Sequence, residues 1–256
     1  MAFALVGLAI GTALLAACVG PSSTGSLAAG TAQPTPTVGT TFDKPIPTSV
    51  ADIKFTDQSG APVTLQSFHG KTVVMSDFLT LCQEICPLTS SNFSELQRQL
   101  DHAGLTGQVQ LVEVTVDPVR DTVPRLAAYQ KLFGAKSNWD FLTGTPAEVA
   151  ALWKSFGVEY DKVAKGAGQP PIDWWTAKSL QYDVNHQDVV FVLGTNGDER
   201  WLTEGSPDTR GVAPPAPLLK FMNDNGKHNI ASPETPSWAA SDVAQAVAYV
   251  TGKPVN

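Results

Sequence analysis

The sequence has few cysteines, few basic residues and a single long apolar run. Its 256 residues include 3 cysteines, and 17 lysines and arginines stand against 24 aspartates and glutamates, which gives a net charge of −7. Three cysteines are too few for a disulfide-stabilised miniprotein, and an acidic chain without a basic cluster is poorly suited to binding nucleic-acid phosphates. The single apolar run excludes a polytopic membrane protein, whereas a hydrophobic content of 43% is enough for one sizeable core.

That apolar run lies at the N-terminus and ends in a cysteine. Residues 1–17 carry no charged side chain, and a run of about 15 apolar residues is short for a membrane-spanning helix but typical of a signal peptide. Residues 15–18 read Leu-Ala-Ala-Cys, which resembles a bacterial lipobox, although the first basic residue is Lys44. The segment predicts a cleaved signal peptide, lipidation of Cys18 and an extracytoplasmic, membrane-anchored protein. In the alternative, Cys18 lies in an uncleaved anchor with the same orientation.

The segment after Cys18 has the composition of a linker. Residues 18–49 are rich in proline, glycine, serine, threonine and alanine, and they lack hydrophobic periodicity. We therefore expect the lipidated cysteine and a flexible tether over this range. The globular domain is expected over 50–256, with two irregular excursions near 161–180 and 204–236.

The globular part alternates short apolar strands with helices. Hairpins are predicted over 53–65 and 189–202, where turn residues separate two strand-like runs. Buried strands are predicted over 72–78 and 110–116. Helices are predicted over 87–103, 123–133, 146–156 and 238–250. This order of elements predicts an α/β domain with a partly parallel sheet.

Two cysteines follow the first buried strand, where ligand and redox sites of such sheets collect. Pro87 suits the first helical position, so we expect Cys86 at the N-cap, where backbone N–H groups and the helix dipole stabilise a thiolate. In a regular helix, residues 82 and 86 would have Cβ atoms about 5–6 Å apart, compared with about 3.5–4.5 Å in a disulfide. The spacing favours a bridging metal ion, but a loop at Pro87 would equally allow a disulfide between Cys82 and Cys86.

Residues 82–87 read Cys-Gln-Glu-Ile-Cys-Pro in this strand-to-helix turn, and the chain resembles the SCO/SenC family of copper chaperones. Three further motifs carry the resemblance in the same order. They are Val-Asp-Pro-Val-Arg-Asp at 116–121, Phe-Leu-Thr-Gly at 141–144 and Tyr-Asp-Val-Asn-His at 182–186. The resemblance covers about 53–201. It implies a thioredoxin-like fold, with a central mixed sheet flanked by helices and an added N-terminal hairpin.

The resemblance also implies that Cys82, Cys86 and His186 bind copper, as Cu(I), Cu(II) or both. Two thiolates and one imidazole suit Cu(I) and tolerate Cu(II), whereas structural zinc usually takes a fourth protein ligand. Asp117 and Asp121 are candidates for supporting the ligands or facing a partner. As turn and helix-cap residues, however, these two carboxylates need no such role.

The sequence departs from the family pattern beside the ligands. Gln83 and Glu84 follow the first cysteine, where the family usually has Pro-Asp. The two excursions are expected to alter a docking surface while the ligand set remains whole. Asp183 and Asp188 are close to His186 in sequence and are candidates for orienting its ring, although both could equally be unrelated to it.

The sequence therefore predicts a membrane-anchored, extracytoplasmic copper chaperone. The family implies that its client is the CuA-bearing subunit of cytochrome c oxidase. The alternative is a thiol–disulfide oxidoreductase that acts on client cysteines, with Cys82 and Cys86 as catalytic residues. A peroxidase is less favoured, because Ser76 and Thr80 do not supply the Pro-x3-Thr-x2-Cys pattern of peroxiredoxins. His186 discriminates between the first two functions, since metal binding needs it and thiol exchange does not.

Overall fold

A computed structural model describes residues 1–2, 33–164 and 172–255 of the chain. The predicted signal peptide and Cys18 lie outside the described residues, so cleavage and lipidation stay predictions. No described helix combines the length and the hydropathy that crossing a membrane would require.

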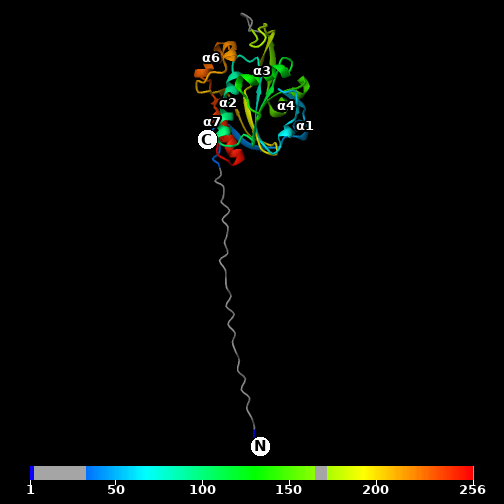
Figure 1. The fold of residues 1–256 in the computed structure, drawn as a ribbon, viewed down its shortest axis with the longest axis vertical. Helices are drawn as coiled ribbons and strands as arrows, with labels where there is room; N and C mark the ends of the chain where they lie inside the picture. The colour runs from blue at the N-terminus through cyan, green and yellow to red at the C-terminus, as the bar shows by residue number, and fades with distance from the viewer. Residues whose placement is uncertain (3–32, 165–171, 256) are drawn as a thin grey trace. The chain divides into compact units, whose positions relative to one another are not determined.

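An eight-stranded mixed sheet forms the centre of the domain (Figure 1), in the strand order β1-β10-β9-β4-β5-β6-β2-β3. The strands are β1 Thr40–Lys44, β2 Phe55–Asp57, β3 Pro62–Val63, β4 Thr72–Phe78, β5 Val109–Thr115, β6 Trp139–Thr143, β9 Val189–Leu193 and β10 Glu199–Glu204. Strands β4, β5 and β6 run parallel to one another, and the other neighbours pair antiparallel. The predicted partly parallel sheet and both predicted hairpins are confirmed.

Helices cover both faces of this sheet. They are α1 Thr48–Ala51, α2 Cys86–His102, α3 Val123–Phe133, α4 Pro146–Phe156, α5 Ala216–Phe221, α6 Asp224–Ala231, α7 Ala240–Thr251 and a short 3-10 helix, Leu65–Phe68. In Figure 1 the strands lie between α2 and α7 on one side and α1 and α4 on the other. Strands β4, β5 and β9 are buried along their whole length, as expected of strands covered on both faces.

Local signals in the sequence explain the bounds of α4. The Thr145 side chain accepts a hydrogen bond from the Glu148 N–H, and the Glu148 carboxylate accepts one from the Thr145 N–H. This reciprocal pair is a capping box, and Pro146 fits the first helical position. Gly157 ends the helix in the left-handed conformation, with φ 74°, where glycine has no Cβ to clash.

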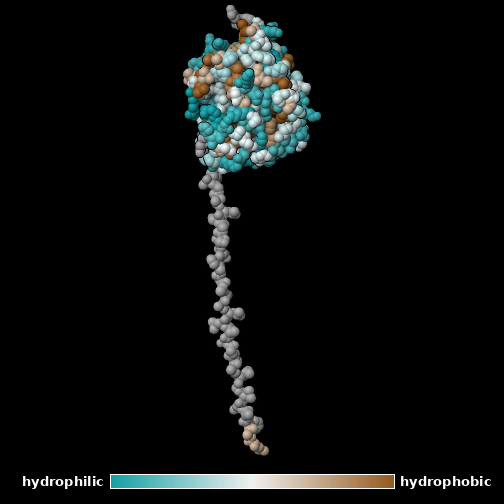
Figure 2. Space-filling model, in the orientation of Figure 1, coloured by the Kyte–Doolittle hydropathy of each residue, from teal (hydrophilic) through white to brown (hydrophobic). Residues whose placement is uncertain are grey.

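Two smaller strand pairs lie outside the main sheet. β7 (Tyr160–Ala164) pairs antiparallel with β8 (Tyr182–His186), so the first predicted excursion begins within a strand and ends just before another. β11 (Ser206–Pro207) pairs parallel with β12 (Ser237–Trp238), and α5 and α6 lie between them in the second excursion. On the face that Figure 2 shows, hydrophilic residues cover most of the domain and apolar residues are scattered in small groups.

The predicted tether ends earlier than we expected. Residues 40–44 form β1, which pairs with β10, so the expected boundary at residue 49 is wrong. Lys44 Nζ lies 2.6 Å from the carboxylate of the buried Glu199, and Trp201 Nε1 donates to the Val38 carbonyl at 2.9 Å. Backbone pairing to an available sheet edge needs no hydrophobic periodicity. A linker-like composition therefore concealed this strand.

Candidate metal centre

The two cysteines and the histidine come together at the carboxyl end of β4. Cys82 lies in the loop that follows β4, Cys86 is the first residue of α2, and His186 is the last residue of β8. The N-cap of α2 is Ile85, so the predicted N-cap position of Cys86 is wrong by one residue. The Cys86 N–H, at the start of the helix, donates to the Cys82 sulfur at 3.3 Å. Backbone donors at the helix start thus stabilise charge on Cys82.

The three side chains form a compact group that can hold a metal ion. One donor atom from each of Cys82, Cys86 and His186 lies within 4.8 Å of the other two, and Cys86 Sγ is 3.2 Å from His186 Nε2. Both cysteines are free thiols. Cys82 is 8% exposed and Cys86 is fully buried. A cavity of about 200 Å³ opens beside them, lined by residues 82–85 and 183–186.

A buried carboxylate, which the sequence prediction missed, orients the histidine ring. Asp77 Oδ2 lies 2.6 Å from His186 Nδ1, and Asp77 Oδ1 accepts a hydrogen bond from the Val189 N–H at 3.0 Å. With Nδ1 held from behind, Nε2 faces the sulfurs, which is how carboxylates orient metal-binding histidines. An aspartate inside a mainly apolar strand was the available signal.

The two carboxylates that we proposed for orienting the ring have other partners. Asp183 accepts a hydrogen bond from the Val184 N–H at 2.8 Å. Asp188 accepts hydrogen bonds from the Thr89 hydroxyl at 3.0 and 3.1 Å. Burial raises the pKa of Asp188 well above its usual value, and the charge of Asp77 raises it further. The prediction that Asp183 or Asp188 holds the ring is therefore wrong.

The surroundings of the cluster shift the pKa values of the two thiols in opposite directions. Burial alone would raise the pKa of Cys82, but hydrogen bonds from Cys86 and His186 lower that pKa well below its usual value. Burial raises the pKa of Cys86, and its interactions with Cys82 raise it further. Burial opposes protonation of His186, yet hydrogen bonds to Asp77 and Cys82 raise its pKa well above the ordinary value. Without metal, these interactions favour a thiolate at Cys82 and a protonated imidazole at His186, whereas they oppose ionisation of Cys86.

The predicted supporting residues Asp117 and Asp121 contact the segments on which Cys82 and His186 lie. The Asp121 carboxylate is buried and accepts hydrogen bonds from the Thr80 N–H and hydroxyl and from the Thr115 hydroxyl. Burial raises the pKa of Asp121 to about 6, although hydrogen bonds from Thr115 and Thr80 oppose that shift. Through Thr80, this carboxylate holds the loop that carries Cys82.

Asp117 supports the strand that carries the histidine. Its carboxylate pairs with Arg120 and accepts a hydrogen bond from the Tyr182 hydroxyl at 2.9 Å. Arg120 in turn donates to the Tyr182 carbonyl at 2.8 Å. Tyr182 begins β8 and His186 ends it, so Asp117 acts on His186 through the strand.

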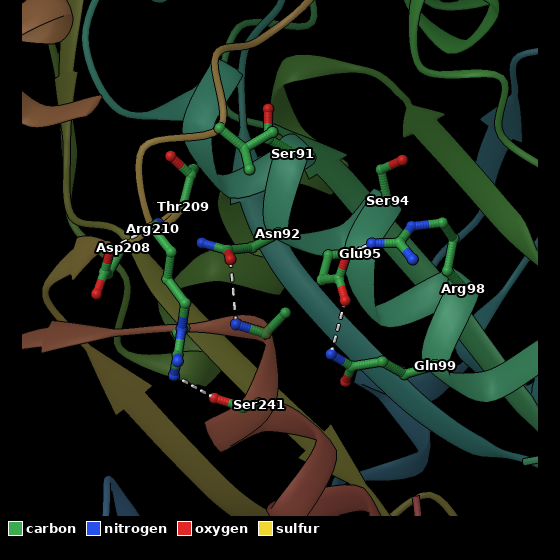
Figure 3. Close-up of a pocket in the computed structure, with 13 residues that line it drawn as sticks. Ser91, Asn92, Ser94, Glu95, Arg98, Gln99, Asp208, Thr209, Arg210 and Ser241 are labelled. Atoms are coloured by element: carbon green, nitrogen blue, oxygen red, sulfur yellow. Dashed lines mark hydrogen bonds and ion pairs between the residues drawn. The ribbon is translucent and has the colours of Figure 1, made fainter. Parts of the chain in front are cut away.

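A second cavity, of about 410 Å³, lies between α2 and the start of α7 (Figure 3). Asn92 Oδ1 accepts from the Ala240 N–H at 3.1 Å there, and Arg210 donates to the Ser241 hydroxyl at 2.9 Å. Within the described residues, the one group of metal-binding side chains is the cysteine–histidine cluster. The second cavity therefore has no part in the candidate metal site.

Comparison with known proteins shows which family this chain matches. The family model described as SCO1/SenC matches residues 46–213. The SCO1 protein homologue of Bacillus subtilis is 32% identical over 108 residues, which are 41% of this chain and 54% of the relative. The mitochondrial SCO2 homologue of Homo sapiens is 30% identical over 146 residues, 57% of this chain and 50% of the relative. This chain therefore spans about half the length of that relative.

A solved structure supports the fold. The copper-bound ScoI of Arabidopsis thaliana superposes with a TM-score of 0.50 at 23% identity, covering 65% of this chain and 88% of the other. This likeness confirms the predicted thioredoxin-like fold, with its central mixed sheet and flanking helices. Because the family model matches more than half of the chain, the chain belongs to the SCO1/SenC family.

Proposed function

We propose that this protein is a copper chaperone that binds one copper ion through Cys82, Cys86 and His186 and delivers it to a cuproenzyme. The observation that carries the proposal is the donor set, in which two sulfurs and one imidazole nitrogen converge within 4.8 Å. Soft sulfur donors select Cu(I), and an added imidazole also accommodates Cu(II). Copper is the cargo of this site, and the family implies the CuA subunit of cytochrome c oxidase as the client.

The exposure of the ligands supports transfer as well as binding. Cys82 retains 8% exposure and faces the cavity, whereas Cys86 is fully buried. A client ligand that enters the cavity would therefore meet Cys82 first. Copper binds thiolates and neutral imidazole, so binding competes with protons and affinity is expected to rise with pH.

We further propose that the protein is anchored at the extracytoplasmic face of a membrane through lipidated Cys18. The lipobox-like sequence at 15–18 supports this proposal. A single acyl chain gives only reversible binding, so firm retention implies modification by more than one chain. Mass spectrometry of the mature N-terminus should show cleavage before Cys18 and an added lipid. An unmodified Cys18 in the mature protein would refute the anchor.

Replacing the histidine separates the chaperone from the oxidoreductase. His186→Ala removes a metal ligand but leaves both thiols, so Cu(II) affinity should fall most, whereas Cu(I) can persist on the two sulfurs. Maturation of the client oxidase should fail with the loss of copper binding. Thiol–disulfide exchange depends on thiolate fraction, nucleophilicity and access, and it should fall only modestly. The measurements are copper affinity, exchange rate with a model disulfide, and oxidase maturation in cells.

His102→Ala provides the matched control, because His102 is an exposed residue at the end of α2. This variant should behave as the wild type in all three measurements. If oxidase maturation survives in His186→Ala despite lost copper and fails only when the cysteines are replaced, the oxidoreductase function replaces the chaperone.

A further inference from the structure

The segment between β10 and α7 forms a closed loop. Its two ends are paired by β11 and β12, in which Ser206 faces Ser237 and Pro207 faces Trp238. The Trp238 indole N–H also donates to the Gly205 carbonyl at 3.0 Å. Residues 208–236 therefore leave and return to the domain at one point.

Apolar side chains hold this loop against the domain. Leu218 is fully buried, Met222 is 2% exposed and Phe221 is 8% exposed. Leu218 and Phe221 belong to the same hydrophobic core as the central strands. The loop is thus a packed part of the fold, and α6, which follows these residues, has a fixed position.

The start of α6 contacts the peptide between the two cysteines. The Asn223 N–H donates to the Gln83 carbonyl at 3.1 Å, and Asn223 Nδ2 donates to the Glu84 carboxylate at 2.6 Å. Asn223 Oδ1 accepts from the Gly226 N–H at 2.8 Å, which caps the helix. One side chain therefore both starts α6 and binds the cysteine loop.

Gly226 allows the helix to approach this loop closely. A Cβ at this position would lie 2.4 Å from the Gln83 carbonyl oxygen and 2.9 Å from Glu84 Cα, both of which are backbone atoms. Glycine is less favourable than alanine inside a helix, and the backbone here needs no left-handed conformation. Close packing on residues 83–84 is the physical reason for a glycine at this position.

We propose that Asn223 and Gly226 are positioning residues of the copper site, through which α6 fixes the loop that carries Cys82. This inference rests on the proposed copper binding. Cys86 is part of α2, whereas Cys82 lies in the loop, and its position depends on the contacts of the residues before and after it. Asp121 fixes the preceding Thr80, and α6 fixes the following residues 83–84. The separation and direction of the two sulfurs thus depend on the α6 contact.

Replacing the glycine tests the inference, with a second glycine as control. Gly226→Ala should push residues 83–84 away and weaken Cu(II) binding by about 10- to 100-fold, the usual effect of losing a residue that supports metal ligands. The thiolate-to-copper charge-transfer band should shift as well. Gly107→Ala is the matched control, since a Cβ at Gly107 meets no atom within 4 Å. It should retain the wild-type affinity and spectrum.

A charge exchange tests the same contact without added bulk. Asn223→Asp keeps the acceptor that caps α6 but places a carboxylate against Glu84, so copper affinity should fall. Adding Glu84→Gln restores a donor opposite the new carboxylate and should recover most of the affinity. Glu84→Gln alone should change little, because its amide oxygen still accepts from Asn223. If the role of α6 were purely structural, these variants would lose thermal stability, but copper affinity would not fall in Asn223→Asp and recover in the double variant.

A measurement without copper separates this inference from the proposed function. Alkylation of Cys82 by iodoacetamide, in which the thiolate displaces iodide, reports access to the sulfur when wild type and variants are compared at the same pH. Gly226→Ala should accelerate it, whereas Gly107→Ala should not. Faster alkylation in a protein whose wild type binds no copper would refute the chaperone and retain α6 as the support of the loop. Folded variants with wild-type alkylation rates and wild-type copper spectra would overturn the inference.

Discussion

Two groups of side chains contact the loop after β4: the ligand cluster of Cys82, Cys86 and His186, and the Asp121 cluster, in which Asp121 contacts Thr80 and Thr115. The two clusters differ in whether their polar atoms already have hydrogen-bond partners. The Asp121 carboxylate has its oxygens engaged by Thr80 and Thr115. In the ligand cluster, Asp77 holds the back of the His186 ring, while Nε2 and the sulfurs converge beside a cavity. A buried carboxylate with satisfied hydrogen bonds holds structure, whereas converging soft donors form a binding site.

Removing a thiol should have the largest effect. Cys82→Ser or Cys86→Ser replaces a soft sulfur by a weak oxygen ligand, and each should abolish tight copper binding. The measurement is a copper titration with a competing chelator. Circular dichroism should show that both variants stay folded. Full copper affinity in either variant would contradict the assignment of the thiols as ligands.

Removing the Asp121 carboxylate should lower stability and leave copper binding intact. Asp121→Ala leaves buried donors of Thr80 and Thr115 without acceptors, which should lower the free energy of unfolding by about 3 kcal/mol. Below its unfolding temperature the variant should still bind one copper ion. Urea denaturation and copper titration measure the two effects. A variant of normal stability that binds no copper would place Asp121 among the ligands instead.

Changing Asp77 tests whether a buried carboxylate that is not a ligand still determines copper affinity. Asp77→Asn removes the charge that holds His186 and stabilises its ring, so Cu(II) affinity should fall by about 10- to 100-fold. The alkylation pH profile of Cys82 should also move to higher pH, because a less charged ring lowers the pKa of that thiol less. Asp183→Asn is the matched control, since Asp183 bonds the neighbouring backbone N–H. Equal losses in both variants would show that Asp77 has no orienting role.

An effect on stability alone, which depends on pH, is expected in the core beneath the site. Burial raises the pKa of Glu113 to about 8, against hydrogen bonds from Ser90 and Trp139. The folded state therefore binds one more proton than the unfolded state between the ordinary pKa of 4.5 and about 8. Within this window Glu113 should lower the free energy of unfolding by about 1.4 kcal/mol per unit rise in pH.

Glu113→Gln imitates the neutral acid and should remove that contribution. Its free energy of unfolding should exceed that of the wild type by a margin that grows as the pH rises through the window. Urea denaturation at several pH values measures the difference between the two proteins. An identical pH dependence in both would show that Glu113 does not titrate in this range.

Local patterns in the sequence predicted much of the fold. The capping box at Thr145 and the terminating Gly157 placed α4 correctly. The apolar runs placed the central strands because those strands are buried throughout. Residues 40–44 were missed, since a strand at the sheet edge is held by backbone pairing and needs no apolar pattern.

The residues of the candidate metal site were found in motifs that are contiguous in sequence, but the residues that hold them in place were not predicted. Asp77 and His186 are 109 positions apart, and the Asn223 contact with Glu84 joins residues 139 positions apart. Local sequence patterns do not predict which distant elements pack together. The start of α2 was wrong by one residue because Pro87 fits either of the first helical positions.

The central claim is that two sulfurs and one imidazole bind a single copper ion. X-ray absorption at the copper edge, combined with a titration of the full protein, tests it most directly. The account predicts one copper per chain with two sulfur ligands and one imidazole, and loss of the imidazole signal in His186→Ala. Copper bound by nitrogen and oxygen donors alone, or an unchanged spectrum in Cys82→Ser, would contradict it.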